Sequence, residues 1–245
     1  MIQDKVIITG ISKGLGRAVA ESIPKEKVIG ISRTTPKNYT GEYFLINIAN
    51  YNRVIALFDT LSNYLENKKV ALVLCAGTVG INGGILDSPL EDWEKTIKTN
   101  LLGNLAVIKS LIPSMIKTGY GRIVFLAGGG AAYAYPKFSG YSLSKVAIVR
   151  EVENLAEELR DKIEDFSIIA LAPGAMETDM LKRVREAGAE VKTTVNISEP
   201  VQFINRFLSM EKEEACTLSG KFIHVKDDLN TEPFFNKWLL RRIEK

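Results

Sequence analysis

Short apolar runs alternate with amphipathic segments along the whole chain. The runs are continuously apolar, as is typical of strands that are buried on both faces of a sheet. They predict seven strands, at Val6–Thr9, Val28–Ser32, Tyr43–Ile48, Val70–Cys75, Arg122–Ala127, Ser167–Ala172 and Lys221–Val225. Apolar spacings of three and four residues predict helices, most clearly at Gly14–Ile23, Arg53–Leu65, Trp93–Ile116 and Tyr141–Leu159.

The alternation of strands and helices predicts a single α/β domain over residues 1–245. We expect a Rossmann-type, doubly wound parallel sheet of about seven strands with helices on both faces. Right-handed crossovers place the carboxyl ends of all strands on one edge, which is where ligands bind in such sheets. A chain of 245 residues is long enough for one such domain, and it contains no repeat or linker-like stretch.

The charge balance argues against nucleic-acid and anionic-membrane partners. The chain has 32 Lys and Arg against 29 Asp and Glu, and the two signs are interleaved. One histidine, His224, and two distant cysteines, Cys75 and Cys216, leave too few ligands for a metal site or a Ser-His-Asp triad. We see no leader pattern at the N-terminus and no apolar run of about 18 residues, so we expect a cytoplasmic protein.

Three glycines separate the first predicted strand from the helix that follows it. The segment reads Thr9-Gly10-Ile11-Ser12-Lys13-Gly14-Leu15-Gly16. Glycine permits tight turns and close approach of the backbone to a pyrophosphate, and the helix N-terminus offers free N–H groups to anionic oxygens. We interpret the segment as a phosphate-binding loop; a glycine-rich turn without a ligand is the alternative.

The glycine spacing, TGxxxGxG, resembles that of the short-chain dehydrogenase/reductase family. Four further segments match the family in order along nearly the whole chain. They are Leu74-Cys75-Ala76-Gly77 where the family usually reads NNAG, Asn100, Tyr141-Ser142-Leu143-Ser144-Lys145 for YxxxK, and Pro173-Gly174 with Thr178 for PGxxxT. The resemblance implies an oxidoreductase that transfers a hydride between a nicotinamide and a ketone or secondary alcohol, with Tyr141, Lys145 and Asn100 as catalytic residues.

The end of the second predicted strand favours NADP(H) over NAD. Ser32 is neutral where NAD enzymes of this kind usually carry an acidic residue, and Arg33 and Lys13 are cationic. Charge-assisted hydrogen bonds from two cations suit a 2′-phosphate, although two solvated surface cations are the alternative. The expected cofactor-binding residues are Gly10, Ser12, Lys13, Gly14, Leu15, Gly16, Arg33, Asn47, Ile48, Ala76, Gly77, Tyr141, Lys145, Pro173, Gly174 and Thr178.

Tyr141 and Lys145 are four residues apart and therefore share one face of a predicted helix. A nearby ammonium favours phenolate, so we expect Lys145 to lower the pKa of Tyr141. Tyr141 can then exchange a proton with the oxygen of a carbonyl or alcohol substrate. By resemblance, Lys145 also holds the nicotinamide ribose, and Asn100 supports a water that links Lys145 to solvent.

The serine that the family usually places thirteen residues before the tyrosine is absent, and Gly128 occupies its position. One interpretation is that another donor replaces it: a loop N–H, a water, Ser139, Tyr133 or Tyr135. Ser139 lies just before the predicted helix, however, and is placed to be its N-cap. A second interpretation is low but real activity. The third is a protein that binds NADP(H) without catalysing redox chemistry.

In the family, the segment after PGxxxT forms a variable lid over the pocket. Residues 179–200 correspond to that lid, and we expect them to select the substrate. The lid carries four cations, at Lys182, Arg183, Arg185 and Lys192. They would suit an acidic substrate, but a solvated helix explains such a mixture of charges more simply. The glycine spacing and the modest length disfavour an extended nucleotide-sugar epimerase or dehydratase.

Family members are usually dimeric or tetrameric. The resemblance therefore implies a homodimer or homotetramer, with the Asn100 and Tyr141 helices at an interface. After the last predicted strand the chain continues into an aromatic-rich tail that includes Phe234, Phe235 and Trp238. We expect this tail to dock on its own domain or on a neighbouring subunit.

Overall fold

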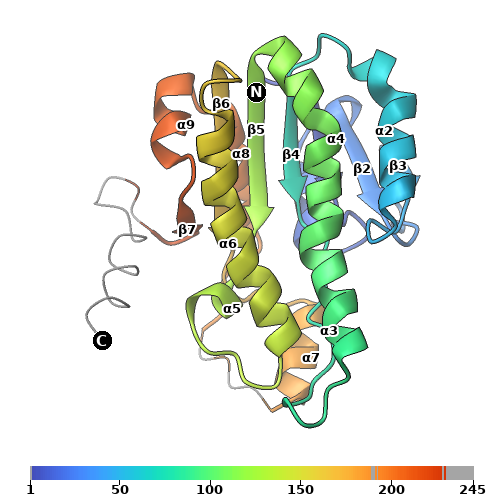
Figure 1. Cartoon of the computed structure of the whole chain (residues 1–245), viewed down its shortest axis with the longest axis vertical. Coiled ribbons are helices and arrows are strands. Elements are labelled where there is room, and N and C mark those ends of the chain that lie inside the picture. The colour runs from blue at the N-terminus through green and yellow to red at the C-terminus, as the bar shows by residue number, and fades with distance from the viewer. Residues whose placement is uncertain (1, 189–190, 192, 228, 230–245) are drawn as a thin grey trace.

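The computed structural model describes residues 2–188, 191, 193–227 and 229, and the aromatic tail and Lys192 lie outside them. Seven parallel strands form one sheet in the order β3-β2-β1-β4-β5-β6-β7 (Figure 1). This confirms the predicted parallel, doubly wound arrangement. The strands are β1 Lys5–Thr9, β2 Val28–Ser32, β3 Glu42–Leu45, β4 Val70–Leu74, β5 Tyr120–Leu126, β6 Asp165–Ala172 and β7 Phe222–His224.

Helices cover both faces of the sheet because apolar side chains point from the strands to either side. On one face, buried residues of α2, α4 and α6 pack against the sheet, and on the other face those of α1, α8 and α9 do so. The helices are α1 Gly14–Ser22, α2 Tyr51–Leu65, α3 Leu90–Ile97, α4 Gly103–Thr118, α5 Gly129–Ala132, α6 Ser139–Leu159, α7 Asp179–Glu186, α8 Ser198–Ser209 and α9 Lys212–Leu218. A single turn of 3₁₀ helix, Lys25–Lys27, precedes β2.

Two predicted boundaries are wrong for local reasons. The third strand ends at Leu45 rather than Ile48, because the chain turns where the Asn50 N–H donates to the Asn47 carbonyl. The segment predicted as one helix over Trp93–Ile116 is α3 and α4 joined by a π-helical turn at Lys98–Leu102. Widened turns of this kind often mark functional sites.

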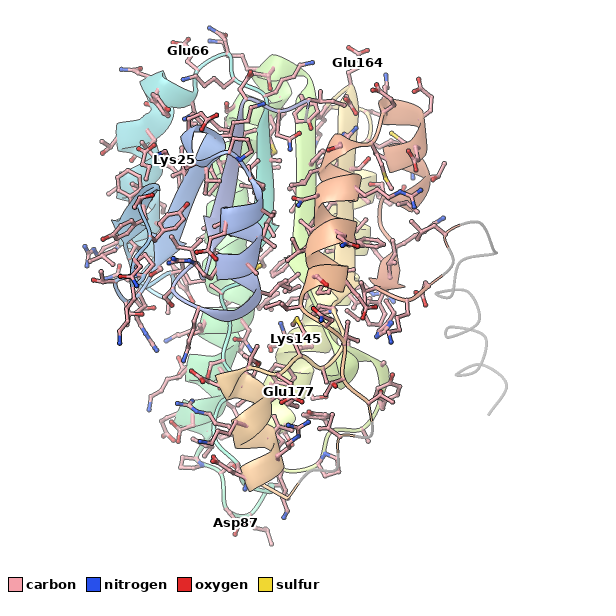
Figure 2. All side chains as sticks on the ribbon, turned by 180° about the vertical axis from the view of Figure 1, so that it is seen from behind. Lys25, Glu66, Asp87, Lys145, Glu164 and Glu177 are labelled. Carbon is pink, nitrogen blue, oxygen red and sulfur yellow. The ribbon has the colours of Figure 1, made fainter. Side chains whose placement is uncertain are left out.

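All seven strands point their carboxyl ends toward one end of the molecule, where α5 and α7 lie (Figure 1). Figure 2 shows Lys145 and Glu177 near this end and Glu66 and Glu164 at the opposite end. The sheet topology therefore brings the chemistry-bearing motifs of the sequence to one edge. No helix among the described residues is both long and apolar enough to cross a membrane.

Candidate active site

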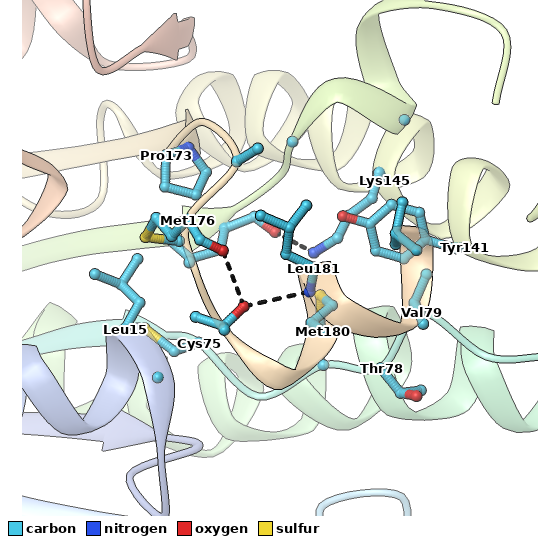
Figure 3. A pocket seen from close by; sticks show the side chains of 18 of the residues that line it. Leu15, Cys75, Thr78, Val79, Tyr141, Lys145, Pro173, Met176, Met180 and Leu181 are labelled. Carbon is cyan, nitrogen blue, oxygen red and sulfur yellow. Dashed lines mark hydrogen bonds between the residues drawn. The ribbon is translucent and has the colours of Figure 1, made fainter. Parts of the chain in front are cut away.

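A cavity of about 1520 Å³ opens at the carboxyl ends of the strands (Figure 3). Every residue of the predicted cofactor-binding set lines it. Asn100 does not line the cavity; it is fully buried behind the wall. The fold thus brings together segments that are up to about 170 residues apart in sequence.

The phosphate-binding loop is compact because two of its positions tolerate only glycine. Gly10 has a φ of +80°, and a Cβ atom there would lie 2.9 Å from the Ala76 backbone. A Cβ atom at Gly16 would lie 2.5 Å from the Gly10 carbonyl oxygen. The helix α1 can therefore begin directly at the cavity wall, with its N–H groups turned toward the space that a pyrophosphate needs.

The end of β2 presents one cation, Arg33, and no carboxylate to the cavity. Arg33 is exposed, and the preceding Ser32 is buried, with its hydroxyl donating to the Thr34 carbonyl. Lys13 is also exposed, but its Nζ lies 2.6 Å from an Asp179 carboxylate oxygen. That ion pair joins the phosphate-binding loop to the first turn of α7.

Tyr141 and Lys145 lie side by side on α6 and both line the cavity (Figure 3). The Lys145 Nζ lies 5.5 Å from the centre of the Tyr141 ring and donates a hydrogen bond of 2.6 Å to the Leu126 carbonyl oxygen. Burial lowers the pKa of Lys145 to about 8. The ammonium is therefore close to its titration range at neutral pH.

The expectation of a lowered Tyr141 pKa is wrong for this structure. Burial raises the pKa of Tyr141 well above its usual range, and the neighbouring Tyr135 phenol raises it further. Lys145 directs its Nζ to the Leu126 carbonyl rather than to the phenol oxygen, so it does not offset that burial. Tyr141 is consequently a phenol, and thus a proton donor, at neutral pH.

The buried side chain of Asn100 joins two segments of the cavity wall behind Tyr141. Its Oδ1 accepts from the Thr78 N–H at 2.7 Å, and its Nδ2 donates to the Thr78 carbonyl at 2.9 Å and to the Ser144 hydroxyl at 3.0 Å. The Ser144 hydroxyl in turn donates to the Tyr141 carbonyl. The π-helical turn places Asn100 between α6 and the segment after β4, so its side chain ties these two walls together.

The backbone at Gly128 excludes an ordinary serine. Its φ of +142° and ψ of −178° define a conformation that is essentially restricted to glycine. A Cβ atom there would lie 3.2 Å from the Tyr141 hydroxyl oxygen. Ser139, one of the candidate replacement donors, does not line the cavity. It is also not an N-cap, because α6 begins at Ser139 itself and Phe138 takes the cap position.

Helix α7 lies across the cavity (Figure 3) and begins at Asp179, and the hydroxyl of its N-cap residue Thr178 accepts from the Leu181 N–H. Leu181 and Val184 are buried and line the cavity. The cations of the helix face away: Arg185 pairs with Glu177, and Lys182 is exposed. The helix thus turns Leu181 and Val184 into the cavity and its cations away from it, while Asp179 at its first turn lines the cavity beside Lys13.

Residues 4–189 match the family model described as short chain dehydrogenase. The chain belongs to this family. Its members are oxidoreductases that use a nicotinamide cofactor, so the match accounts for the glycine loop, the Tyr141–Lys145 pair and the cavity that they share.

Three similar proteins illustrate the range of the short-chain dehydrogenases. An NADPH-dependent pterin aldehyde reductase of Arabidopsis thaliana is 33% identical over 193 residues, covering 72% of this chain and 76% of that protein. An uncharacterized oxidoreductase of Schizosaccharomyces pombe is 26% identical, covering 90% and 96%. The solved structure of an aldohexose dehydrogenase of Thermoplasma acidophilum superimposes with a TM-score of 0.78 at 23% identity, covering 95% and 98%.

Sequence motifs of the short-chain dehydrogenases do not identify the substrate side of this cavity. Beyond the motif residues its wall is mostly apolar, and it includes Val79, Tyr133, Tyr135, Phe138, Met176, Met180, Leu181, Val184, Val191 and Val195. These residues come from four separate segments with no common spacing. The aromatic residues just before YxxxK, which the sequence suggests as hydroxyl donors, are the signal in the sequence for this apolar wall.

Proposed function

We propose that this protein is an NADP(H)-dependent reductase of carbonyl groups carried by apolar molecules, with Tyr141 as the proton donor. One observation carries the proposal: the phenol of Tyr141 and the glycine loop open into one continuous cavity. A dinucleotide bound on the loop and a carbonyl bound beside Tyr141 would therefore meet. The likeness to an NADPH-dependent aldehyde reductase supports the same reaction class.

The residues present fit a phosphorylated dinucleotide. The glycine loop and the N-terminus of α1 would hold the pyrophosphate, Lys13 and Arg33 the 2′-phosphate, and Lys145 the nicotinamide ribose. The reduced cofactor would supply the hydride for the carbonyl carbon. Because Asp179 already pairs with Lys13, Arg33 is the exposed cation that we expect to contribute most to the choice of NADPH.

The protonation state of Tyr141 favours reduction. Its raised pKa keeps the phenol protonated at neutral pH, so it can donate a proton to the carbonyl oxygen as that oxygen gains charge. Hydride addition to the carbon and proton addition to the oxygen together convert the carbonyl into an alcohol. The reverse reaction would need Tyr141 as a base, which its raised pKa disfavours.

The lining beside Tyr141 supports an apolar substrate rather than an acidic one. Val79, Phe138 and Val184 form a small buried cluster against which the Tyr135 and Tyr141 rings pack. The cations of α7 do not line the cavity. A Cβ atom at Gly130 would lie 3.0 Å from the Tyr141 ring, so this glycine allows the ring to pack closely against the loop after β5.

The alternative function is binding of NADP(H) without catalysis, which the glycine at position 128 favours. A serine is absent there, and without a substitute the substrate oxygen lacks one hydrogen-bond donor. A protein of this kind would retain tight NADPH binding but would reduce no carbonyl compound.

Cofactor binding tests the first part of the proposal. We expect NADPH to bind much more tightly than NADH in fluorescence titrations, and Arg33→Asp to shrink that preference by removing a cation and adding a repulsive carboxylate. Lys37→Asp, which makes the same change of charge at an exposed residue outside the cavity, is the matched control. Equal affinities for the two cofactors in the unmodified protein would refute the NADP preference.

Turnover tests the second part. NADPH oxidation is followed against a panel of ketones, aromatic aldehydes and keto acids at neutral pH. We expect apolar carbonyl compounds to react and carboxylate-bearing ones of similar size to react poorly. Tight NADPH binding with no turnover across the panel would favour the binding-only alternative.

We further propose a homodimer or homotetramer that assembles through α4 and α6. The cytoplasmic location expected from the sequence stays a prediction.

A further inference from the structure

Gly128 occupies the position of the usual serine, so a substrate oxygen next to Tyr141 would have no hydrogen-bond donor from that side chain. Most hydroxyl groups around Tyr141 are already engaged. The Ser142 hydroxyl donates to the Gly130 carbonyl at 2.7 Å, and the Ser144 hydroxyl donates to the Tyr141 carbonyl. The Thr178 hydroxyl donates to the Met176 carbonyl at 3.2 Å. A replacement donor must therefore come from another segment of the cavity wall.

Tyr135, in the loop between α5 and α6, meets this requirement. Its ring lies 5.9 Å from the Tyr141 ring, centre to centre, with an angle of 45° between the planes. The residue lines the cavity and is half-buried. Burial raises the pKa of its phenol, and no side chain among the described residues perturbs that pKa through a hydrogen bond. Its phenol therefore stays protonated at neutral pH, on a ring that packs against the Tyr141 ring in the cavity wall.

The loop holds the Tyr135 ring in a defined position. The ring also packs against Phe138, with 5.6 Å between centres, and the Phe138 N–H donates to the Tyr135 carbonyl. The next turn is anchored to the segment after β4, because the Gly83 N–H donates to the Lys137 carbonyl at 2.9 Å. A donor that is fixed before substrate binds stabilises developing charge more effectively than a mobile one.

Tyr133 is a weaker candidate, although it also lines the cavity. The residue is 69% exposed, far more than the half-buried Tyr135. No aromatic contact joins it to Tyr141 within the described residues, whereas Tyr135 has one. A solvent-exposed phenol gains little by hydrogen bonding to a substrate, because water already satisfies it.

We propose that the Tyr135 hydroxyl donates a hydrogen bond to the carbonyl oxygen of the substrate, in the role that a serine fills in related enzymes. This inference rests on the proposed reductase function. Tyr141 transfers the proton to the same oxygen, while Tyr135 keeps its proton and only stabilises the charge that develops there. The loss of the serine at position 128 is then compensated from the loop that precedes α6.

The variant Tyr135→Phe tests the inference because it keeps the ring packing against Tyr141 and Phe138. NADPH oxidation is measured with benzaldehyde and acetophenone as probes, together with the NADPH dissociation constant and the melting temperature. We expect kcat to fall by about 10²–10³-fold, as for loss of one oxyanion donor. NADPH affinity and melting temperature should stay unchanged, which separates this role from a structural one. Tyr64→Phe, at an exposed tyrosine of α2 outside the cavity, is the control and should retain kcat, and Tyr133→Phe is measured in parallel to compare the two cavity tyrosines.

The outcomes separate the inference from the function on which it rests. Normal kcat in Tyr135→Phe beside an inactive Tyr141→Phe would overturn the role of Tyr135 alone. Loss of kcat in Tyr133→Phe rather than in Tyr135→Phe would also overturn it. An unmodified protein that binds NADPH but reduces neither probe, nor any member of the wider carbonyl panel, would overturn the reductase function itself.

Discussion

Gly128 shows how one backbone conformation can determine which side chain serves the site. At its φ of +142° no side chain fills the space beside the Tyr141 hydroxyl, and the Tyr135 ring packs against the Tyr141 ring at 5.9 Å between centres. The sequence revealed that the serine was absent. It could not reveal the reason, because a positive φ depends on how the loop after β5 packs against α6.

Restoring the serine should therefore harm the protein. Gly128→Ser forces a side chain into a conformation that costs about 1–3 kcal/mol, and it places a Cβ atom 3.2 Å from the Tyr141 hydroxyl. We expect a lower melting temperature in thermal unfolding and a kcat no higher than that of the unmodified protein. Gly129→Ala is the stability control, since its added Cβ atom would make only a 3.4 Å contact with Tyr133. A variant that is both more active and equally stable would contradict this prediction.

Lys145 should give the enzyme an unusual pH dependence. Burial lowers the pKa of its ammonium to about 8 in the protein without cofactor. The group is charged below that pH and neutral above it, so the positive charge next to Tyr141 is lost as pH rises. We expect kcat/KM for NADPH, which reports the free enzyme, to fall as pH increases through about 8. A profile that is flat or rising across this range would show that the charge of Lys145 is not needed.

Among the elements, the strands could be predicted more completely than the lid. Seven continuous apolar runs correspond to the seven observed strands, and the inner strands are apolar because they are buried on both faces, whereas the edge strand β3 is partly exposed. The lid helix α7 is different: its sequence is dominated by charge, and only Leu181 and Val184 mark the buried face. Its pairing with the phosphate-binding loop through Asp179 depends on tertiary placement across 166 residues, which no local pattern encodes.

The ion pair between α7 and the phosphate-binding loop should weaken cofactor binding slightly. Asp179 neutralises Lys13, and its own charge repels a phosphate. We expect Asp179→Asn to tighten NADPH binding only modestly, because exposed ion pairs are weak, and to leave NADH binding nearly unchanged. Glu186→Gln, on the outer face of the same helix, is the control. Weaker NADPH binding in Asp179→Asn would show instead that the pair holds the lid in its binding position.

For the molecule as a whole, the parallel sheet and the edge that holds the cavity could be predicted from the sequence, but the electrostatics of the cavity could not. The motif residues indicated which segments meet at the carboxyl edge. The raised pKa of Tyr141 and the lowered pKa of Lys145 arise from burial by several distant segments together. The direction of proton transfer that we propose therefore needed the three-dimensional arrangement.

The outer surface of α4 and α6 supports the expected oligomer. Leu143 and Val146 are 52% and 40% exposed on α6, and Leu102 is 41% exposed just before α4. We expect light scattering at micromolar concentration to show a dimer or tetramer, and Leu143→Glu with Val146→Glu to shift it toward monomer. Ile55→Glu, an equally exposed apolar position on α2, should leave the assembly intact. A monomer in the unmodified protein would contradict this prediction.

The most direct test of the central claim is the kcat of Tyr141→Phe for NADPH-dependent reduction of an apolar carbonyl compound such as benzaldehyde, with NADPH affinity measured on the same sample. Loss of the proton donor should lower kcat by about 10²-fold or more, because general acids contribute about 10²–10⁴-fold. NADPH affinity should remain, because the loop and the cations that would hold the cofactor are untouched. Turnover by Tyr141→Phe equal to that of the unmodified protein would contradict the account, since the proton would then come from elsewhere.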